Sequence, residues 1–160
     1  GFSSDYWNLI EPLPDANQTI RFINVTRARI TGVESSIKFS PGIRHLTCDL
    51  GYTYMDPQDL ELDEILAYRP KQLLQSSLYY QWKRMDVSAD YRYVARLENV
   101  KLYPSDDRVA QKTVNTHVGV KIGAWHVSAH IYNLFNHNHT QMERTLMPIR
   151  NYALTLRAAY

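Results

Sequence analysis

The chain has 160 residues, a net charge of +2 and a hydrophobic content of 44%. That size allows one globular domain or about eight membrane strands with their loops. The balanced charge and the lack of a basic run do not favour a nucleic-acid partner. Tyrosine is unusually frequent, with 12 Tyr and 3 Trp against 4 Phe. Such side chains, with an apolar body and a polar tip, favour membrane interfaces.

Several simple features narrow the possibilities further. Cys48 is the single cysteine and is expected to be a small buried hydrophobe. The apolar runs are too short for a transmembrane helix. Residues 1–5 have neither the basic region nor the apolar core of a signal peptide. We therefore expect either a mature start at Gly1 or a part of a longer polypeptide.

Alternation of polar and apolar residues recurs along the chain and is interrupted by turn signals, whereas no long segment has a helical period. The pattern predicts an all-β, antiparallel protein of about eight strands. We place these strands at residues 2–10, 20–40, 43–55, 70–84, 86–98, 110–122, 124–135 and 149–160.

The predicted connections alternate between two lengths. Tight turns are expected at residues 40–42, 84–86 and 122–124, and long polar loops at residues 11–19, 56–69, 99–109 and 136–148. Outer-membrane barrels have short periplasmic turns and longer extracellular loops. A soluble meander has no physical reason to sort its loops in this way, so the pattern favours a transmembrane barrel segment.

Six of the eight predicted strands have one uncharged, mostly apolar face. The side chains of this uncharged set belong to the even-numbered residues within 46–54, 74–82, 114–122 and 152–160, and to the odd-numbered residues within 87–95 and 125–131. A charge facing lipid at mid-depth costs about 2–4 kcal/mol, so we assign this set to the bilayer. The opposite set would line a wet or plugged lumen: His45, Asp49, Gln75, Gln81, Lys83, Asp90, Arg92, Arg96, Asn115, His117, Lys121, His126, His130 and Arg157. A soluble barrel would point the apolar set inward instead.

Aromatic side chains gather at both ends of the predicted strands. Trp82, Trp125 and Tyr160 stand next to short turns or at the terminus, whereas Tyr52, Tyr54, Tyr93 and Tyr152 stand toward the long loops. Two such belts are typical of the two interfaces of a bilayer.

Three stretches resemble the C-terminal strands of TonB-dependent receptors. The first is the strand from Asn24 to Glu34, which contains Gly32-Val33-Glu34. The second is Leu50–Asp56 together with Tyr68–Lys71 across a loop. The third is Ile131–Asn136 followed by Met147–Tyr152. Their order and spacing cover nearly the whole chain, with Ile149 standing where the family often has Gly before Arg.

The resemblance implies that residues 1–160 form the C-terminal part, about the last third, of a ~22-stranded barrel. The plug domain, the TonB-contacting segment and the earlier strands would lie outside this sequence. The implied protein is an importer of a scarce nutrient, such as a siderophore or cobalamin, in the bacterial outer membrane. It would have no enzymatic activity and no cofactor. Its implied partners are outer-membrane lipid, the remaining strands and plug, the TonB complex and the assembly machinery.

Candidate functional residues follow from the same scheme. Ligand-binding candidates in the outer loops and lumen are Tyr68, Arg69, Arg92, Arg96, His130, His137 and His139. In the family, a last strand ending in an aromatic residue is the signal read by the assembly machinery. Here that pattern is carried by Tyr152, Leu154, Leu156 and Tyr160.

No metal site or catalytic site is expected. The acidic run at residues 56–64 lacks EF-hand spacing. We expect His137 and His139 to point to opposite sides of a solvated loop. His117, His126 and His130 are expected to bond to a plug or to water. Catalytic carboxylate pairs or Ser-His-Asp sets cannot be assembled convincingly.

Three alternatives remain open from the sequence. The first is a complete eight-stranded outer-membrane barrel with a structural or adhesive role, which requires residues 2–10 to pair with residues 149–160. The second is a soluble ligand-binding barrel with its apolar set inside. The third is a split receptor whose two chains form one barrel.

Overall fold

The computed structural model describes the chain except residues 15–18, 102, 143–144 and 159–160. Its strands are β1 Phe2–Pro14, β2 Ile20–Phe39, β3 Leu46–Asp59, β4 Glu64–Ile65, β5 Gln72–Trp82, β6 Met85–Val94, β7 Gln111–Ile122, β8 Trp125–Tyr132, β9 Thr140–Met142, β10 Thr145–Leu146 and β11 Asn151–Ala158. Within the described ranges, no helix is long and apolar enough to cross a bilayer.

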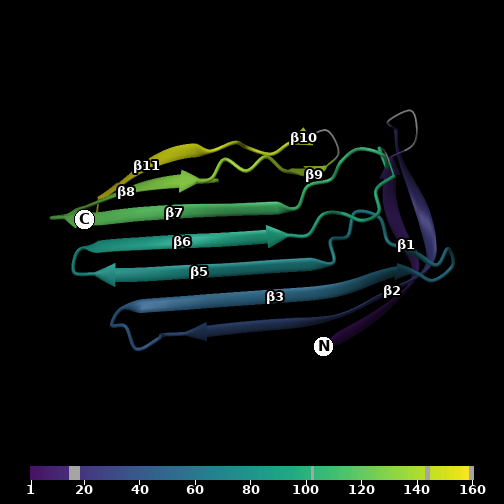
Figure 1. Cartoon of the computed structure of the whole chain (residues 1–160), viewed down its shortest axis with the longest axis horizontal. Coiled ribbons are helices and arrows are strands. Elements are labelled where there is room, and N and C mark those ends of the chain that lie inside the picture. The colour runs from purple at the N-terminus through teal and green to yellow at the C-terminus, as the bar shows by residue number, and fades with distance from the viewer. Residues whose placement is uncertain (15–18, 102, 143–144, 159–160) are drawn as a thin grey trace.

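The eight long strands form one antiparallel sheet in the order β1-β2-β3-β5-β6-β7-β8-β11 (Figure 1). The small strand β4 adds to β3, and β9 pairs with β10 separately. This confirms the predicted fold class and the predicted succession of strands. β1 and β11 lie at opposite edges, and the described residues contain no pairing between them. The closed pairing that the eight-stranded alternative requires is therefore not found there.

The connections that the structure describes sort to two ends of the sheet. The short-turn end holds residues 40–45, 83–84 and 123–124, and the long-loop end holds the other connections (Figure 1). Lys83 and Gly123 have positive φ angles of 52° and 60°. Two-residue hairpin turns need this left-handed backbone because it matches the twist of the flanking strands. The predicted alternation of short turns and long loops is confirmed.

The predicted loops contain more strand than expected. β1 extends to Pro14 and β3 to Asp59, and β4, β9 and β10 all lie within predicted loops. Asp59 pairs with Ala28 and Pro14 with Ile20, so the ladders of β1, β2 and β3 continue beyond the apolar positions. Side-chain alternation could not reveal this, because a backbone ladder can continue where both faces are polar.

β6, in contrast, ends earlier than predicted, at Val94 and not at residue 98. The amide of Ala95 still donates to the carbonyl of Gln72 at 2.9 Å. Gln72 is the first residue of β5, so β5 offers no further partner and the chain leaves the sheet. This early departure frees residues 95–110 to build the long-loop end.

The register confirms the two predicted faces. Leu78 pairs with Cys48 and Ala89, and Val118 pairs with Val87 and Ala129, so apolar side chains form continuous rows across the sheet. Leu78 and Val118 are 47% and 46% exposed, and no second layer covers either face among the described residues. A buried hydrophobic cluster of the described residues, Ala28 and Leu66 with their neighbours, lies at the long-loop end.

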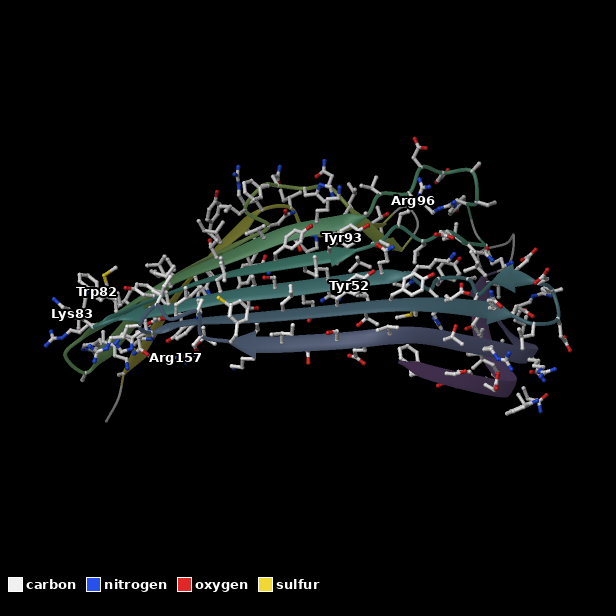
Figure 2. All side chains as sticks on the ribbon, turned by 60° about the horizontal axis from the view of Figure 1, so that its bottom comes forward. Tyr52, Trp82, Lys83, Tyr93, Arg96 and Arg157 are labelled. Atoms are coloured by element: carbon white, nitrogen blue, oxygen red, sulfur yellow. The ribbon has the colours of Figure 1, made fainter. Side chains whose placement is uncertain are left out.

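The aromatic belts also lie where the sequence predicts them. Trp82 and Trp125 adjoin the short turns, and Tyr52 and Tyr93 stand toward the long-loop end (Figure 2). Tyr160 lies outside the described residues. Because the apolar rows are bounded by aromatic side chains at both ends, the sheet has the surface of a bilayer-spanning wall.

Candidate ligand-binding site

Two long loops are bonded to each other at the long-loop end. Tyr68 has a positive φ of 58°, and its amide donates to the carbonyl of Asn99 at 3.0 Å. The side-chain amide of Asn99 donates to the carbonyl of Ile65 at 2.6 Å, and the amide of Lys101 donates to the Tyr68 hydroxyl at 3.2 Å. These bonds fix the segment after β4 against the segment after β6.

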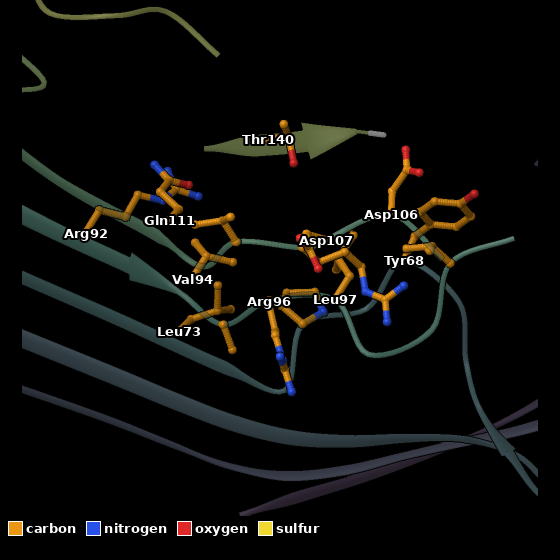
Figure 3. Close-up of a pocket in the computed structure, with 15 residues that line it drawn as sticks. Tyr68, Leu73, Arg92, Val94, Arg96, Leu97, Asp106, Asp107, Gln111 and Thr140 are labelled. Carbon is orange, nitrogen blue, oxygen red and sulfur yellow. The ribbon is translucent and has the colours of Figure 1, made fainter. Parts of the chain in front are cut away.

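A pocket of about 450 Å³ opens between these loops and the ends of β5, β6 and β7 (Figure 3). Leu73, Val94 and Val100 supply apolar lining, and Thr140 of β9 closes one side. The remaining polar lining includes Tyr68, Arg92, Arg96, Asp106, Asp107, Arg108 and Gln111. A concave apolar surface with a few placed polar groups is the usual form of a small-molecule site.

The three arginines of this pocket differ in whether their guanidinium groups have a partner within the described protein. Arg108 donates to the carbonyls of Pro104 at 3.0 Å and Glu98 at 3.3 Å, so it holds its own loop. Arg92 and Arg96 are exposed, and no carboxylate of the described residues lies within ion-pair distance of either one. Asp106 lies on the far side of the pocket from Arg92 (Figure 3). Two guanidinium groups are therefore available to an anionic ligand.

A nearby ion pair does not compete for that ligand. Lys71 Nζ lies 3.0 Å from Glu98 Oε2. Its hydrogen bond to Glu98 raises the pKa of the Lys71 ammonium above the usual value, while partial desolvation opposes the rise. Lys71 and Glu98 neutralise one another, whereas Arg92 and Arg96 form no ion pair among the described residues.

The structure brings together three of the seven predicted ligand-binding residues, namely Tyr68, Arg92 and Arg96. Arg69 does not line the pocket; its Nη2 lies 2.9 Å from Oε1 of Glu11, a carboxylate on β1 that is only 5% exposed. This pair ties the loop after β4 to the edge strand. Arg69 has a structural partner that the sequence pattern did not indicate.

The two loop histidines hold the connection between β8 and β11. His137 Nε2 bonds to the carbonyl of Ala110 at 2.8 Å, and His139 Nδ1 to the carbonyl of His137 at 3.1 Å. Their rings stack with centroids 5.9 Å apart, and His139 is buried. The prediction of a solvated loop with the two rings on opposite sides is wrong: side chains two residues apart along an extended chain share one face, and here the rings stack and His139 is buried.

Asn133 explains how that loop folds back. It is buried, has a positive φ of 52°, and its Oδ1 accepts from the amide of His137 at 2.8 Å. Its Nδ2 donates to the carbonyls of His137 at 3.0 Å and Pro148 at 3.3 Å. One amide side chain thus satisfies three backbone groups, which is a physical reason for an Asn at this place in the Ile131–Asn136 stretch.

His130 lies away from the pocket, on the polar face of β8. Its ring lies 4.5 Å from that of His117, and the Nε2 atoms of His117 and His126 donate to the two oxygens of Asp86 at 2.5 and 2.9 Å. Gly119 makes room for them, since a Cβ there would come within 2.8 Å of Asp86. Among the described residues, no three metal-ligating side chains form a metal site.

Sequence reasoning missed the pocket residues Arg108, Gln111 and Thr140. Gln111 and Thr140 are the first residues of β7 and β9, boundaries that alternation alone does not resolve, and Arg108 lies within the loop before β7. A basic residue in a polar loop was the only available signal for Arg108, and such residues are common in loops without any ligand.

Comparison with known proteins gives the context of this fold. Residues 1–134 match the family described as "TonB dependent receptor-like, beta-barrel". The copper transporter OprC superimposes with a TM-score of 0.79 at 16% identity, over 99% of this chain and 28% of that chain.

Two further solved structures are similar. BauA, the ferric preacinetobactin receptor of Acinetobacter baumannii, has a TM-score of 0.65 at 21% identity, over 96% of this chain and 25% of that chain. Fiu, the ferric-catecholate import receptor of E. coli K12, has a TM-score of 0.69 at 18% identity, over 96% of this chain and 24% of that chain. The chain thus spans about a quarter of these structures. The family match over most of the sequence, and an open sheet of the same fold, mean that the chain belongs to the TonB-dependent receptor-like β-barrel family.

Proposed function

We propose that this chain forms part of the wall and capture loops of an outer-membrane receptor that imports a scarce nutrient, such as a ferric siderophore or cobalamin. The observation that carries the proposal is the pocket at the long-loop end with Arg92 and Arg96 free of acidic partners. Their charge favours an anionic metal chelate among these nutrients. Three similar structures support a metal or metal-chelate cargo: BauA is named a ferric preacinetobactin receptor, Fiu a ferric-catecholate import receptor and OprC a copper transporter.

The proposed partners follow from the same scheme. Outer-membrane lipid would cover the apolar face, and a plug domain and further strands would complete the lumen. The TonB complex would supply energy. The assembly machinery would read β11, where Tyr152, Leu154 and Leu156 are exposed on the apolar face of an edge strand. Tyr160, the fourth residue of this proposed signal, lies outside the described residues.

Arg92→Gln and Arg96→Gln are each expected to weaken binding of a ferric tris-catecholate, which is anionic, by about ten- to hundredfold. Each removes a charge-assisted hydrogen bond of about 1.5–3 kcal/mol. The measurement is quenching of intrinsic fluorescence in the purified full-length protein as the chelate is added.

The matched control for these variants is Lys112→Gln. Lys112 is an exposed cation at the same end of the sheet, but it does not line the pocket. The Lys112→Gln variant should bind the ferric tris-catecholate with the affinity of the parent protein. An equal loss of affinity in Lys112→Gln, or a preference of the parent for an uncharged ferric tris-hydroxamate, would contradict the proposed role of the pocket.

A second experiment tests the proposed orientation. With Cys48→Ser as background, Ser105→Cys in the loop after β6 should react with an impermeant maleimide on intact cells. Ala124→Cys, in the turn between β7 and β8, should react only after the outer membrane is opened, because short turns face the periplasm. Both positions are exposed, so access alone does not separate them. Labelling of Ala124→Cys on intact cells would contradict the proposed orientation, because it would place the short turns outside the cell.

A further inference from the structure

A recess of about 600 Å³ lies at the short-turn end, between the β2–β3 turn and the end of β5. Its lining consists of Arg44, His45, Tyr80, Gln81, Trp82 and Lys83. The amide of Gln81 donates to the carbonyl of His45 at 3.1 Å, which joins the two sides. Every lining side chain can donate a hydrogen bond, two are permanent cations, and none is a carboxylate. This composition is that of an anion site.

The acids at this end of the sheet are already engaged elsewhere. Asp49 lies 3.7 Å from Lys38, and Asp86 accepts from two histidines on the polar face. In the described part of the chain, no carboxylate lies within ion-pair distance of Arg44 or Lys83. The recess therefore keeps two uncompensated cations.

Lys83, one of the two cations, faces the apolar side of the sheet. Lys83 Nζ lies over the ring of Trp82, 4.8 Å from its centroid, and Trp82 belongs to the apolar row (Figure 2). This cation–π contact holds the ammonium above the membrane-facing aromatic belt and not over the lumen. Tyr80 and Trp82 are 39% and 51% exposed, so both aromatic bodies are open to a neighbour.

We propose that this recess binds the phosphate headgroup of an acidic phospholipid in the adjacent leaflet. Tyr80 pairs with Leu46 and Val87 on the apolar face, so apolar surface for acyl chains begins directly beside the cations. A free anion would use the cations alone, whereas a phospholipid uses both surfaces. The inference rests on the proposed function, in that the apolar face must meet lipid.

The test uses the full-length protein in phosphatidylcholine vesicles with a small fraction of spin-labelled phosphatidylglycerol. The fraction of label that is immobilised at the protein reports its relative association constant. Arg44→Gln/Lys83→Gln is expected to lower that constant roughly fivefold for each side chain removed. Lys121→Gln/Arg157→Gln removes the same charge at the same end from the polar face, and it should leave the constant within about twofold of the parent.

Each other outcome overturns the site. An equal loss in both double variants would mean that net charge alone attracts the lipid. Displacement of the label by inorganic phosphate or glycerol phosphate would mean a free-anion site. Quenching of tryptophan fluorescence by brominated phosphatidylcholine distinguishes a failure of the lipid site from a failure of the proposed function. If the parent protein shows no such quenching, the apolar face does not meet lipid. In that case the proposed function itself has failed.

Discussion

Val118→Arg in the full-length protein is expected to prevent most of it from assembling in the outer membrane. Val118 lies in the middle of an apolar row, between Val87 and Ala129, and is 46% exposed on that face. An arginine there would meet acyl chains at a cost of about 2–4 kcal/mol. The measurement is the amount of heat-modifiable, folded protein in the isolated membrane fraction.

His117→Arg is the matched control, one residue away on β7 and on the opposite face. Its guanidinium would lie beside Asp86, which already accepts a hydrogen bond from His117. Assembly of this variant should resemble that of the parent. Equal assembly of Val118→Arg and His117→Arg would exclude a bilayer against the apolar face.

The 160 residues expressed alone are expected not to form a closed barrel. β1 and β11 lie at opposite edges of the sheet, and each leaves the backbone groups of one side unpaired within the described residues. Each such group costs several kcal/mol in hydrocarbon, so a lone sheet of this kind is not stable in a bilayer. Refolding the chain into detergent should give no band of shifted mobility in unheated gels, and no blue shift of tryptophan emission.

The same segment within the full-length protein is the positive control for this experiment. There the neighbouring strands would pair with both edges, and the unheated sample should run as a compact species. A compact, heat-modifiable monomer of the isolated chain would instead support the eight-stranded alternative, with β1 closing against β11.

The sequence by itself determined the sheet, its two faces and its two ends. Side chains on a strand alternate between its two faces, and a charge that faces lipid is energetically costly. The sequence of a strand therefore indicates which of its faces is apolar. In the observed register, the apolar rows through Leu78 and Val118 consist of residues that the sequence places on the apolar face. Arg92 and Arg96 are likewise candidates from the sequence, because both fall in the polar set that is expected to line the lumen.

Only the tertiary structure decided what the loops do. The pocket exists because Asn99 bonds to Ile65 and Lys101 to Tyr68, contacts over more than 30 positions that no local pattern records. The pairing of Arg69 with Glu11 and the burial of His139 are of the same kind. A loop has no periodic pattern of polar and apolar side chains. Its shape therefore depends on which distant backbone groups form hydrogen bonds with its polar side chains.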